Sequence, residues 1–413
     1  MTQTRIQSLK AFHVRIGLKK PIRHASFTRT QNDTLILRCE LSDGSVGWGE
    51  GLPRPYVTGE TIDSAIHQLE TADLSAIGDC DFSDPIAVAH AISLWELRQW
   101  EPIDTDTPAE RHSIPSVGCD PKKSGFGNSV RCALELAVLD AATRSAGTSL
   151  SCIIQDLAEP LGLKQLSGSV RYSGVITSSS GRIAQLRSAI KMRLFGFDAV
   201  KVKVGHPEIC DPKLLARVRR MVGQKMDVRI DANEAWTPDI AAKQIHKLFP
   251  FGISCVEQPL ADRHRSHLAE LRREVDVPIM LDESLCSISD AVEAASTKSC
   301  DAFNIRLSKC GGIMNSLQLM KIAQANGLFV QLGCLVGETG ILSAAARHFG
   351  CSVGPIRYFE GSYDRFLITD RLTHEDCTFG YGGLGKAIKG HGLGVTVHEA
   401  DIHRMATRTL RCL

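Results

Sequence analysis

Four charged motifs recur at nearly even spacing in the second half of the chain, each at the end of a short apolar, β-branched run. They are Lys201-Val202-Lys203, Asp231-Ala232-Asn233, Glu257-Gln258-Pro259 and Asp282-Glu283-Ser284. Side chains two residues apart on a strand share a face, so both lysines, and likewise Asp231 and Asn233, can point into one cavity. Three carboxylates from neighbouring strands suit a hard cation such as Mg²⁺, and no histidine or cysteine spacing competes with them.

This set of residues predicts a metal-assisted enolisation site. A cation held by Asp231, Glu257 and Asp282 can bind a substrate carboxylate and stabilise the enediolate that forms when the α-proton leaves. We expect Lys203 to be the base, because Lys201 and the metal disfavour a further positive charge beside them. Alternatives stay open: strand-end carboxylates also cap helices or stay solvated, and Lys203 could form a salt bridge to a ligand carboxylate.

The segments that must position these motifs alternate between strand-like and helix-like runs of roughly 25–30 residues per unit, which favours a parallel barrel. The predicted strands cover residues 170–176, 199–204, 228–230, 253–256, 279–281, 302–307, 328–332 and 354–360. Residues 5–50 alternate as an antiparallel sheet does, with a turn at 42–44. A helix is expected from a cap at Asn128 to Gly147, after a long excursion over residues 76–127.

Composition limits the kinds of partner. A length of 413 residues suits about two domains, and a formal charge of +2 disfavours a nucleic-acid or membrane surface. We therefore expect a small-molecule carboxylate substrate. The fourteen cysteines contain no CxxC pair, and the opening residues lack an apolar signal core. Both features favour a cytoplasmic protein with reduced thiols.

The motifs together resemble one known family. With the later run Asn304-Ile305-Arg306-Leu307-Ser308-Lys309-Cys310-Gly311-Gly312, they resemble the muconate lactonizing enzyme subgroup of the enolase superfamily, whose members include dipeptide epimerases and are similar to mandelate racemase. The resemblance implies a modified (β/α) TIM-type barrel at residues 166–369 and an α+β capping domain at 1–165, completed by about 370–413. It also implies that Asp231, Glu257 and Asp282 bind Mg²⁺, that Lys203 is the acid/base and that Lys201 tunes it. We expect a homo-oligomer.

One position departs from the family pattern. Dipeptide epimerases carry a second catalytic lysine on the sixth strand, where this chain has Arg306. Arginine does not release its proton near neutral pH, so we expect Arg306 to hold a substrate carboxylate or the enediolate. Lys309 lies three residues later, and an odd offset on a strand would turn it to the other face. We therefore expect Lys309 to be structural.

Substrate contacts are expected from two segments that resemble the family's closing loops and from the last two strands. Arg23 lies in the first loop, and Arg54 and Tyr56 lie in residues 51–58; either arginine could meet an anionic group or simply be exposed. Glu338 could contact the substrate or favour a helix start. Glu360 stands where dipeptide epimerases have an Asp-x-Asp pair that binds an ammonium group; it keeps at most one carboxylate and could pair with a cation.

The sequence thus predicts a Mg²⁺-dependent isomerase or lyase that abstracts the proton α to a carboxylate. A one-base outcome, cycloisomerisation or syn-elimination of a β-hydroxy acid, is preferred because of Arg306. The alternatives are a dipeptide or N-acyl amino acid epimerase and a non-catalytic carboxylate-binding protein. Gly311-Gly312 could cradle a phosphate, but a tight turn is the favoured interpretation.

Overall fold

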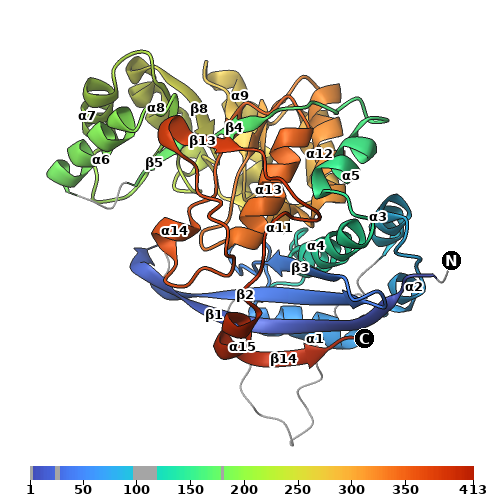
Figure 1. Cartoon of the computed structure of the whole chain (residues 1–413). Coiled ribbons are helices and arrows are strands. Elements are labelled where there is room, and N and C mark those ends of the chain that lie inside the picture. Colours follow the sequence, from blue (N-terminus) through green and yellow to red (C-terminus); the bar gives the residue numbers. More distant parts are fainter. Residues whose placement is uncertain (1–2, 24–27, 96–118, 178–180) are drawn as a thin grey trace, which may run out of the picture.

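The computed structural model describes residues 3–23, 28–95, 119–177 and 181–413. Two parts lie one above the other in Figure 1: an antiparallel sheet with helices, and a parallel barrel surrounded by helices. The predicted fold class, a modified barrel with an α+β cap, is confirmed. No helix within these ranges is both long enough and apolar enough to cross a membrane.

The cap sheet contains strands from both ends of the chain. β1 (Ile6–Arg23), β2 (Thr28–Leu41) and β3 (Val46–Gly51) are antiparallel neighbours, and the C-terminal strand β14 (Ala406–Arg411) pairs with the other edge of β1. The expected turn joins β2 to β3, where Gly44 adopts a φ of +86°. The exact domain boundaries, after residues 165 and 369, stay a prediction.

A long helix, α4 (Asn128–Ser145), lies directly on β3. Three alternating glycines, Gly47, Gly49 and Gly51, make this contact, because a Cβ atom on any of them would stand only 1.9–2.1 Å from backbone atoms of the helix. The helix covers the range that was predicted, but its cap is not Asn128. The N-cap residue is Gly127, while the Asn128 amide donates to the carbonyl oxygens of Cys286 and Lys309 at 2.7 and 2.6 Å.

The remaining helices of the cap region are short. They are α1 (Ile62–Thr71), α2 (Ser75–Gly78), α3 (Pro85–Leu94), α5 (Leu150–Ala158) and α15 (Glu399–Met405). The excursion expected over residues 76–127 therefore contains α3 and most of α2, and residues 96–118 lie outside the described part of the chain.

The barrel consists of eight parallel strands in sequential order. They are β5 (Gly174–Ile176), β6 (Ala199–Lys203), β7 (Asp227–Asp231), β8 (Ile253–Glu257), β9 (Ile279–Leu281), β10 (Ala302–Ile305), β11 (Phe329–Leu332) and β12 (Tyr358–Phe359). The outer helices are α6 (Arg182–Leu194), α7 (Asp211–Val222), α8 (Pro238–Leu248), α9 (Leu268–Glu274), α10 (Ile288–Thr297), α12 (Ile313–Ala325) and α13 (Gly340–Ser352). A bridge between Tyr172 and Phe359 closes the ring, because it links the start of the first strand to the last one.

Three predicted strands differ from the observed ones, the last of them because the run at 354–360 forms a strand at Tyr358–Phe359 alone. The run at 170–176 is divided into β4 (Ser169–Arg171), which pairs with β13 (Leu384–Lys386), and the barrel strand β5. The run at 302–307 ends earlier, at Ile305, and the one-turn helix α11 (Leu307–Cys310) follows it. This second difference changes the direction of Lys309, as described below.

The barrel interior is layered by the alternation of side chains along each strand. Buried apolar residues, including Cys255, Met280, Ala302 and Tyr358, form a cluster of their own at the amino-terminal ends of the strands. Two residues further along the same strands, the inward positions are polar: Glu257, Asp282, Asn304 and Glu360. The chemistry therefore lies at the carboxyl ends of the strands, where barrels of this kind carry their active sites.

Candidate active site

Four neighbouring strands bring the predicted metal ligands and lysines together. β6 ends at Lys203, β7 at Asp231 and β8 at Glu257, while Asp282 directly follows β9. In the strand register Lys203 is opposite Asp231, and Asp231 is opposite Glu257. The three carboxylates are at most 1% exposed, so each needs a positive or hydrogen-bonding partner inside the barrel.

Glu257 is the most densely contacted of the three carboxylates. Its oxygens accept hydrogen bonds from Asn304 Nδ2 at 2.9 Å, Gln331 Nε2 at 3.2 Å and Lys201 Nζ at 3.2 Å. Burial raises the pKa of Glu257 to about 7, against the opposing effect of Lys201 and with a contribution from Asp231. A further positive charge beside Glu257 would therefore favour its ionised form.

Asp282 lies between two cations. It forms an ion pair with the Arg306 guanidinium, and its Oδ1 accepts from Lys309 Nζ at 3.0 Å. Burial alone would raise the pKa of Asp282, but Arg306 and Lys309 lower it to about 2. Asp282 is therefore ionised at neutral pH.

The expected direction of Lys309 is wrong. Since β10 stops at Ile305 and α11 begins at Leu307, strand alternation no longer applies at residue 309. The fully buried Lys309 amine instead turns toward the site and also donates to the carbonyl oxygens of Asp282 and Asn304, at 2.7 and 2.8 Å. Lys309 thus fixes the ends of two strands and one carboxylate.

Lys201 lies among three carboxylates. Its Nζ is 2.7 Å from Glu360, 3.2 Å from Glu257 and 3.3 Å from Asp231. Burial alone would lower the pKa of Lys201, but Glu257, Glu360 and Asp231 raise it well above the ordinary lysine value. Lys201 is therefore a permanent cation in this cluster.

Lys203 has a different environment at the mouth of the barrel. Its half-buried amine donates to Asn233 Oδ1 at 2.8 Å, and the Asn233 backbone amide donates to Asp231 Oδ1 at 3.0 Å. Asn233 holds this position with a left-handed φ of +44°, a conformation that asparagine tolerates better than most residues. Within the described ranges, no carboxylate lies at ion-pair distance from Lys203.

Arg306 projects into the site from the end of the sixth strand. Besides Asp282, its guanidinium lies 3.7 Å from Glu257 Oε1, and the residue is 9% exposed. Burial opposes the charge, but Asp282 and Glu283 raise the pKa of Arg306 well above its ordinary value. Arg306 therefore remains protonated at neutral pH.

The structure describes two of the three residues that were predicted to contact the substrate from the cap loops. The Arg23 side chain lies outside the described part, and Tyr56 is half-buried in its loop, with its carbonyl oxygen accepting from Lys123 Nζ at 3.0 Å. Arg54 is neither exposed nor free, since it donates to Asn32 Oδ1 at 2.5 Å and to the Val336 carbonyl at 3.3 Å. This arginine ties the cap to the loop after β11.

Glu338 lies in that same loop and is 8% exposed. One of its oxygens accepts from the Leu335 backbone amide at 2.6 Å. Burial raises the pKa of Glu338 to about 8, although the Leu335 amide acts in the opposite direction. The start of α13 is capped by Thr339, whose hydroxyl accepts from the Ile341 amide, and by Glu50 of the cap, which accepts from the Leu342 amide. Glu338 itself therefore does not cap this helix.

The glycine pair before α12 forms a tight turn and not a phosphate cradle. Gly311 and Gly312 have φ values of +85° and +102°, and a Cβ atom at Gly312 would lie 2.7 Å from the carboxylate of Glu135. That carboxylate, from α4, accepts hydrogen bonds from the backbone amides of Ile313 and Met314. The helix start is thus already occupied by a buried carboxyl group.

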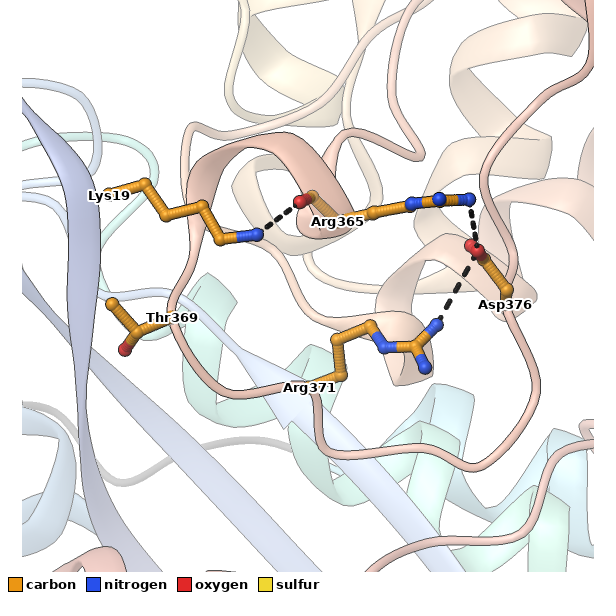
Figure 2. A pocket seen from close by; sticks show the side chains of 5 residues that line it. All are labelled: Lys19, Arg365, Thr369, Arg371 and Asp376. Carbon is orange, nitrogen blue, oxygen red and sulfur yellow. Dashed lines mark hydrogen bonds and ion pairs between the residues drawn. The ribbon is translucent and has the colours of Figure 1, made fainter.

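A cavity of about 450 Å³ opens away from these residues, between the end of β1 and the segment that follows the last barrel strand (Figure 2). It is lined by Lys19, Arg365, Thr369, Arg371 and Asp376. Lys19 Nζ donates to the Arg365 carbonyl at 2.5 Å, and both arginines approach Asp376 Oδ2, at 3.1 and 3.5 Å. Its cations already have partners, so this cavity does not compete with the barrel mouth as the reactive site.

The donors at the barrel mouth have the chemistry that a hard cation requires. Within the described residues, no three acidic, histidine or cysteine side chains already converge as a ligand set, and Lys201 and Arg306 lie against the carboxylate oxygens. All donors are carboxylate oxygens, and the buried Asp231 Oδ2 accepts no hydrogen bond, although it lies 3.3 Å from Lys201 Nζ. The three carboxylates therefore fit a divalent cation that takes over part of the charge compensation.

Sequence reasoning missed Arg229, Asn304, Gln331 and the inward position of Lys309. For Arg229 a signal existed, because it precedes Asp231 by two residues on the same strand and so must face the same interior. Asn304 precedes Arg306 by two residues and so faces the same side. Gln331 lies at a position of β11 that faces the barrel interior. The direction of Lys309 had no comparable signal in the sequence.

Comparison with known proteins agrees with this geometry. Residues 184–401 match the family described as enolase C-terminal domain-like. A hydrophobic dipeptide epimerase from Enterococcus faecalis is 30% identical over 83% of this chain and 87% of its own length, and a chloromuconate cycloisomerase from Cupriavidus necator is 26% identical over 90% and 91%.

Among solved structures, a dipeptide epimerase from Cytophaga hutchinsonii, complexed with Mg and the dipeptide D-Ala-L-Val, superimposes with a TM-score of 0.78. It is 21% identical, and the match covers 99% of this chain and 100% of that one, so this likeness concerns the fold. The relatives named above are isomerases, in agreement with the predicted enzyme class. The resemblance noted in the sequence is thereby confirmed, and the chain belongs to the enolase C-terminal domain-like family and hence to the enolase superfamily.

Proposed function

We propose that this enzyme removes the proton α to a carboxylate from one face of its substrate, with Lys203 as the base. The observation that carries the proposal is the contrast among the cations of the site. Lys201, Arg306 and Lys309 are each paired with carboxylates, whereas the contact of Lys203 is the neutral amide of Asn233. A proton can therefore leave and return at Lys203 Nζ without breaking an ion pair.

We propose Asp231, Glu257 and Asp282 as the residues that hold Mg²⁺. When bound, Mg²⁺ would supply positive charge at the substrate carboxylate, where negative charge develops as the α-proton leaves. The carboxylate donors support this assignment, as does Asp231 Oδ2, which accepts no hydrogen bond and lies 3.3 Å from Lys201 Nζ. Lys201 and Arg306 contact the same carboxylates, so we expect both contacts to loosen on metal binding.

Arg306 supports a reaction that uses a single base. Its guanidinium stays protonated, so it cannot accept a proton from the opposite face. It can donate hydrogen bonds to a substrate carboxylate and to the developing charge on it. Lys203 would then act on one face of the substrate. In syn-elimination it would remove the α-proton and pass it to the leaving hydroxyl group, and in cycloisomerisation it would deliver a proton to the α-carbon once a distal substrate carboxylate has added to the double bond.

An epimerase is the second candidate, because the Enterococcus relative with that name is 30% identical. An epimerase would need a second proton donor on the face opposite Lys203. Of the two basic residues that the structure places toward the site after the sixth strand, Arg306 keeps its proton, and the Lys309 amine is fixed by Asp282 and two carbonyl oxygens. We therefore rank this candidate below the one-base reaction. A small-molecule carboxylate is the proposed ligand in both cases, while a homo-oligomer in the cytoplasm stays a prediction that light scattering and fractionation can check.

The test is a panel of acids incubated with the enzyme and MgCl₂ in D₂O and followed by ¹H NMR. The panel contains both enantiomers of N-acyl amino acids, β-hydroxy acids and unsaturated dicarboxylates. We expect loss of the α-proton signal, or formation of product, from one stereoisomer only. Comparable exchange from both enantiomers would favour the epimerase. Calorimetric binding without exchange or product would favour a non-catalytic carboxylate-binding protein.

A further inference from the structure

We infer that Arg229 and Glu360 form a positioning pair that holds the Lys201 ammonium nearer to Glu360 than to Asp231 and Glu257, and that Glu360 is not a receptor for a substrate cation. The inference deepens the proposed function and rests on it for the role of those two carboxylates. It gives Arg229, which has no role in the proposed function, the role of holding Glu360 in place. It also gives Glu360 a different role from the substrate contact expected from the sequence.

Arg229 is fixed from several sides in the middle layer of the barrel. It is 0% exposed, and its NH2 lies 2.5 Å from Glu360 Oε1. Its NH1 donates to Ser173 Oγ at 3.1 Å, and the guanidinium carbon lies 4.5 Å from the centre of the Tyr358 ring. A planar cation held by a carboxylate, a hydroxyl group and an aromatic face has little freedom to move.

Glu360 links this fixed cation to Lys201. One oxygen meets Arg229, and the other lies 2.7 Å from Lys201 Nζ, nearer than Glu257 at 3.2 Å or Asp231 at 3.3 Å. The first and third strands, through Ser173 and Arg229, and the last strand, through Glu360, thus together determine where the Lys201 ammonium sits. Without Glu360, the ammonium would move fully onto Asp231 and Glu257 and compete there with any other cation.

Both oxygens of Glu360 are used in this arrangement, and the residue is only 6% exposed. A substrate ammonium could bind Glu360 only by displacing a buried cation, which would leave that cation without its partner. The eighth strand therefore offers no recognition of a positive group. Substrates whose distal part is neutral or anionic fit this site better than substrates with a free ammonium group.

The test uses Glu360→Gln, Arg229→Met, and Arg229→Lys as the conservative rescue. Glu293→Gln, a 57% exposed carboxylate on α10, is the matched control. Mg²⁺ affinity is measured by calorimetry with MgCl₂ alone. We expect Glu360→Gln and Arg229→Met to weaken it about tenfold, the range seen when partners behind metal ligands are removed. Arg229→Lys should recover most of the loss, and the control should stay within about twofold of the wild type.

A dipeptide with a free amino group, L-Ala-L-Ala, and its N-acetyl form are then titrated into the wild type and Glu360→Gln. We expect Glu360→Gln to change the affinities for the dipeptide and for its N-acetyl form by the same factor, or the wild type to bind the free amine no more tightly than the N-acetyl form. A loss of tenfold or more confined to the dipeptide, with unchanged Mg²⁺ affinity, would overturn the inference.

A separate readout distinguishes this inference from the proposed function. If the wild type bound no Mg²⁺, the proposed metal site would fail, and the inference would be judged on urea unfolding of Lys201→Met, Glu360→Gln and the double variant. We expect the shift of the double variant to be clearly smaller than the sum of the two single shifts, because the Lys201–Glu360 contact is lost in both single variants, while the loss of the Arg229–Glu360 contact is common to both Glu360 variants. Fully additive shifts would contradict the positioning role. Should Arg229→Met fail to fold, Glu360→Gln and Arg229→Lys still decide the question.

Discussion

Replacing Arg306 gives the sharpest test of the site because this residue connects stability with reaction type. The guanidinium pairs with Asp282 and lies 3.7 Å from Glu257, at a position that is 9% exposed. Breaking a buried ion pair by removing one partner costs about 3–5 kcal/mol. Since Lys309 stays 3.0 Å from Asp282, we expect Arg306→Met to lie at the low end, about 3 kcal/mol.

Arg306→Lys should cost less, about 1–2 kcal/mol, because the ammonium keeps the charge and loses only the planar pair of donors. Urea unfolding at pH 7 measures both variants. Arg171→Met is the control. The Arg171 side chain is 58% exposed, so its ion pair with Asp198 should contribute no more than about 0.5 kcal/mol to the free energy of unfolding. An Arg306→Met protein as stable as the wild type would refute the view that Arg306 compensates the buried carboxylates.

Arg306→Lys also introduces an amine that can exchange a proton on the face opposite Lys203. We therefore expect α-proton exchange in D₂O to appear for the stereoisomer that the wild type leaves unlabelled. The Arg306→Met protein, which has no such amine, should not gain this exchange. Exchange of both stereoisomers by the wild type itself would show that the one-base reading is mistaken.

Three further predictions follow from the buried charges. Lys309→Met should cost about 3–5 kcal/mol in urea unfolding, because it leaves Asp282 short of one cation and two carbonyl oxygens without a donor; a cost below 1 kcal/mol would be inconsistent with the contacts. Burial raises the pKa of Glu135 from 4.5 to about 7, so the folded state binds a proton that the unfolded state has lost, and this stabilisation disappears as pH rises through 7. Relative to Glu135→Gln, the wild type should therefore lose roughly 2–3 kcal/mol between pH 5 and pH 8, and a constant difference would argue against the raised pKa. Millimolar MgCl₂ should raise the melting temperature of the wild type and EDTA should reverse the effect, whereas Asp231→Asn should show a much smaller shift.

Much of the fold could be predicted because the barrel strands are short apolar runs at regular intervals. Residues Lys203, Asp231 and Glu257 lie at strand ends, as their pattern indicates, and strand alternation is enough to turn them inward. The close contact of α4 with β3 also had a signal in the alternating glycines 47, 49 and 51. The expected direction of Lys309 was wrong, although its expected structural role was not, because the point at which β10 ends decides where this side chain turns and apolar periodicity does not mark that point.

The pairing of side chains inside the site could not be predicted in the same way. Glu360 is separated from Lys201 and Arg229 by more than a hundred residues, and its partners depend on the closure of the barrel through Tyr172 and Phe359. The sequence predicts only that Arg54 lies in a loop. Its burial against Asn32 and Val336 depends on how the cap meets the barrel. Such contacts follow from tertiary packing, on which local residue patterns carry little information.

The most direct measurement of the central claim compares the wild type with Lys203→Ala. The acid that shows exchange in the NMR panel is incubated in D₂O with saturating MgCl₂, and deuterium at its α-carbon is followed over time. We predict a loss of at least about a hundredfold in the exchange rate, as for removal of a general base, with Mg²⁺ affinity within a few-fold of the wild type. Exchange by Lys203→Ala at a rate close to that of the wild type would contradict the assignment of Lys203 as the base.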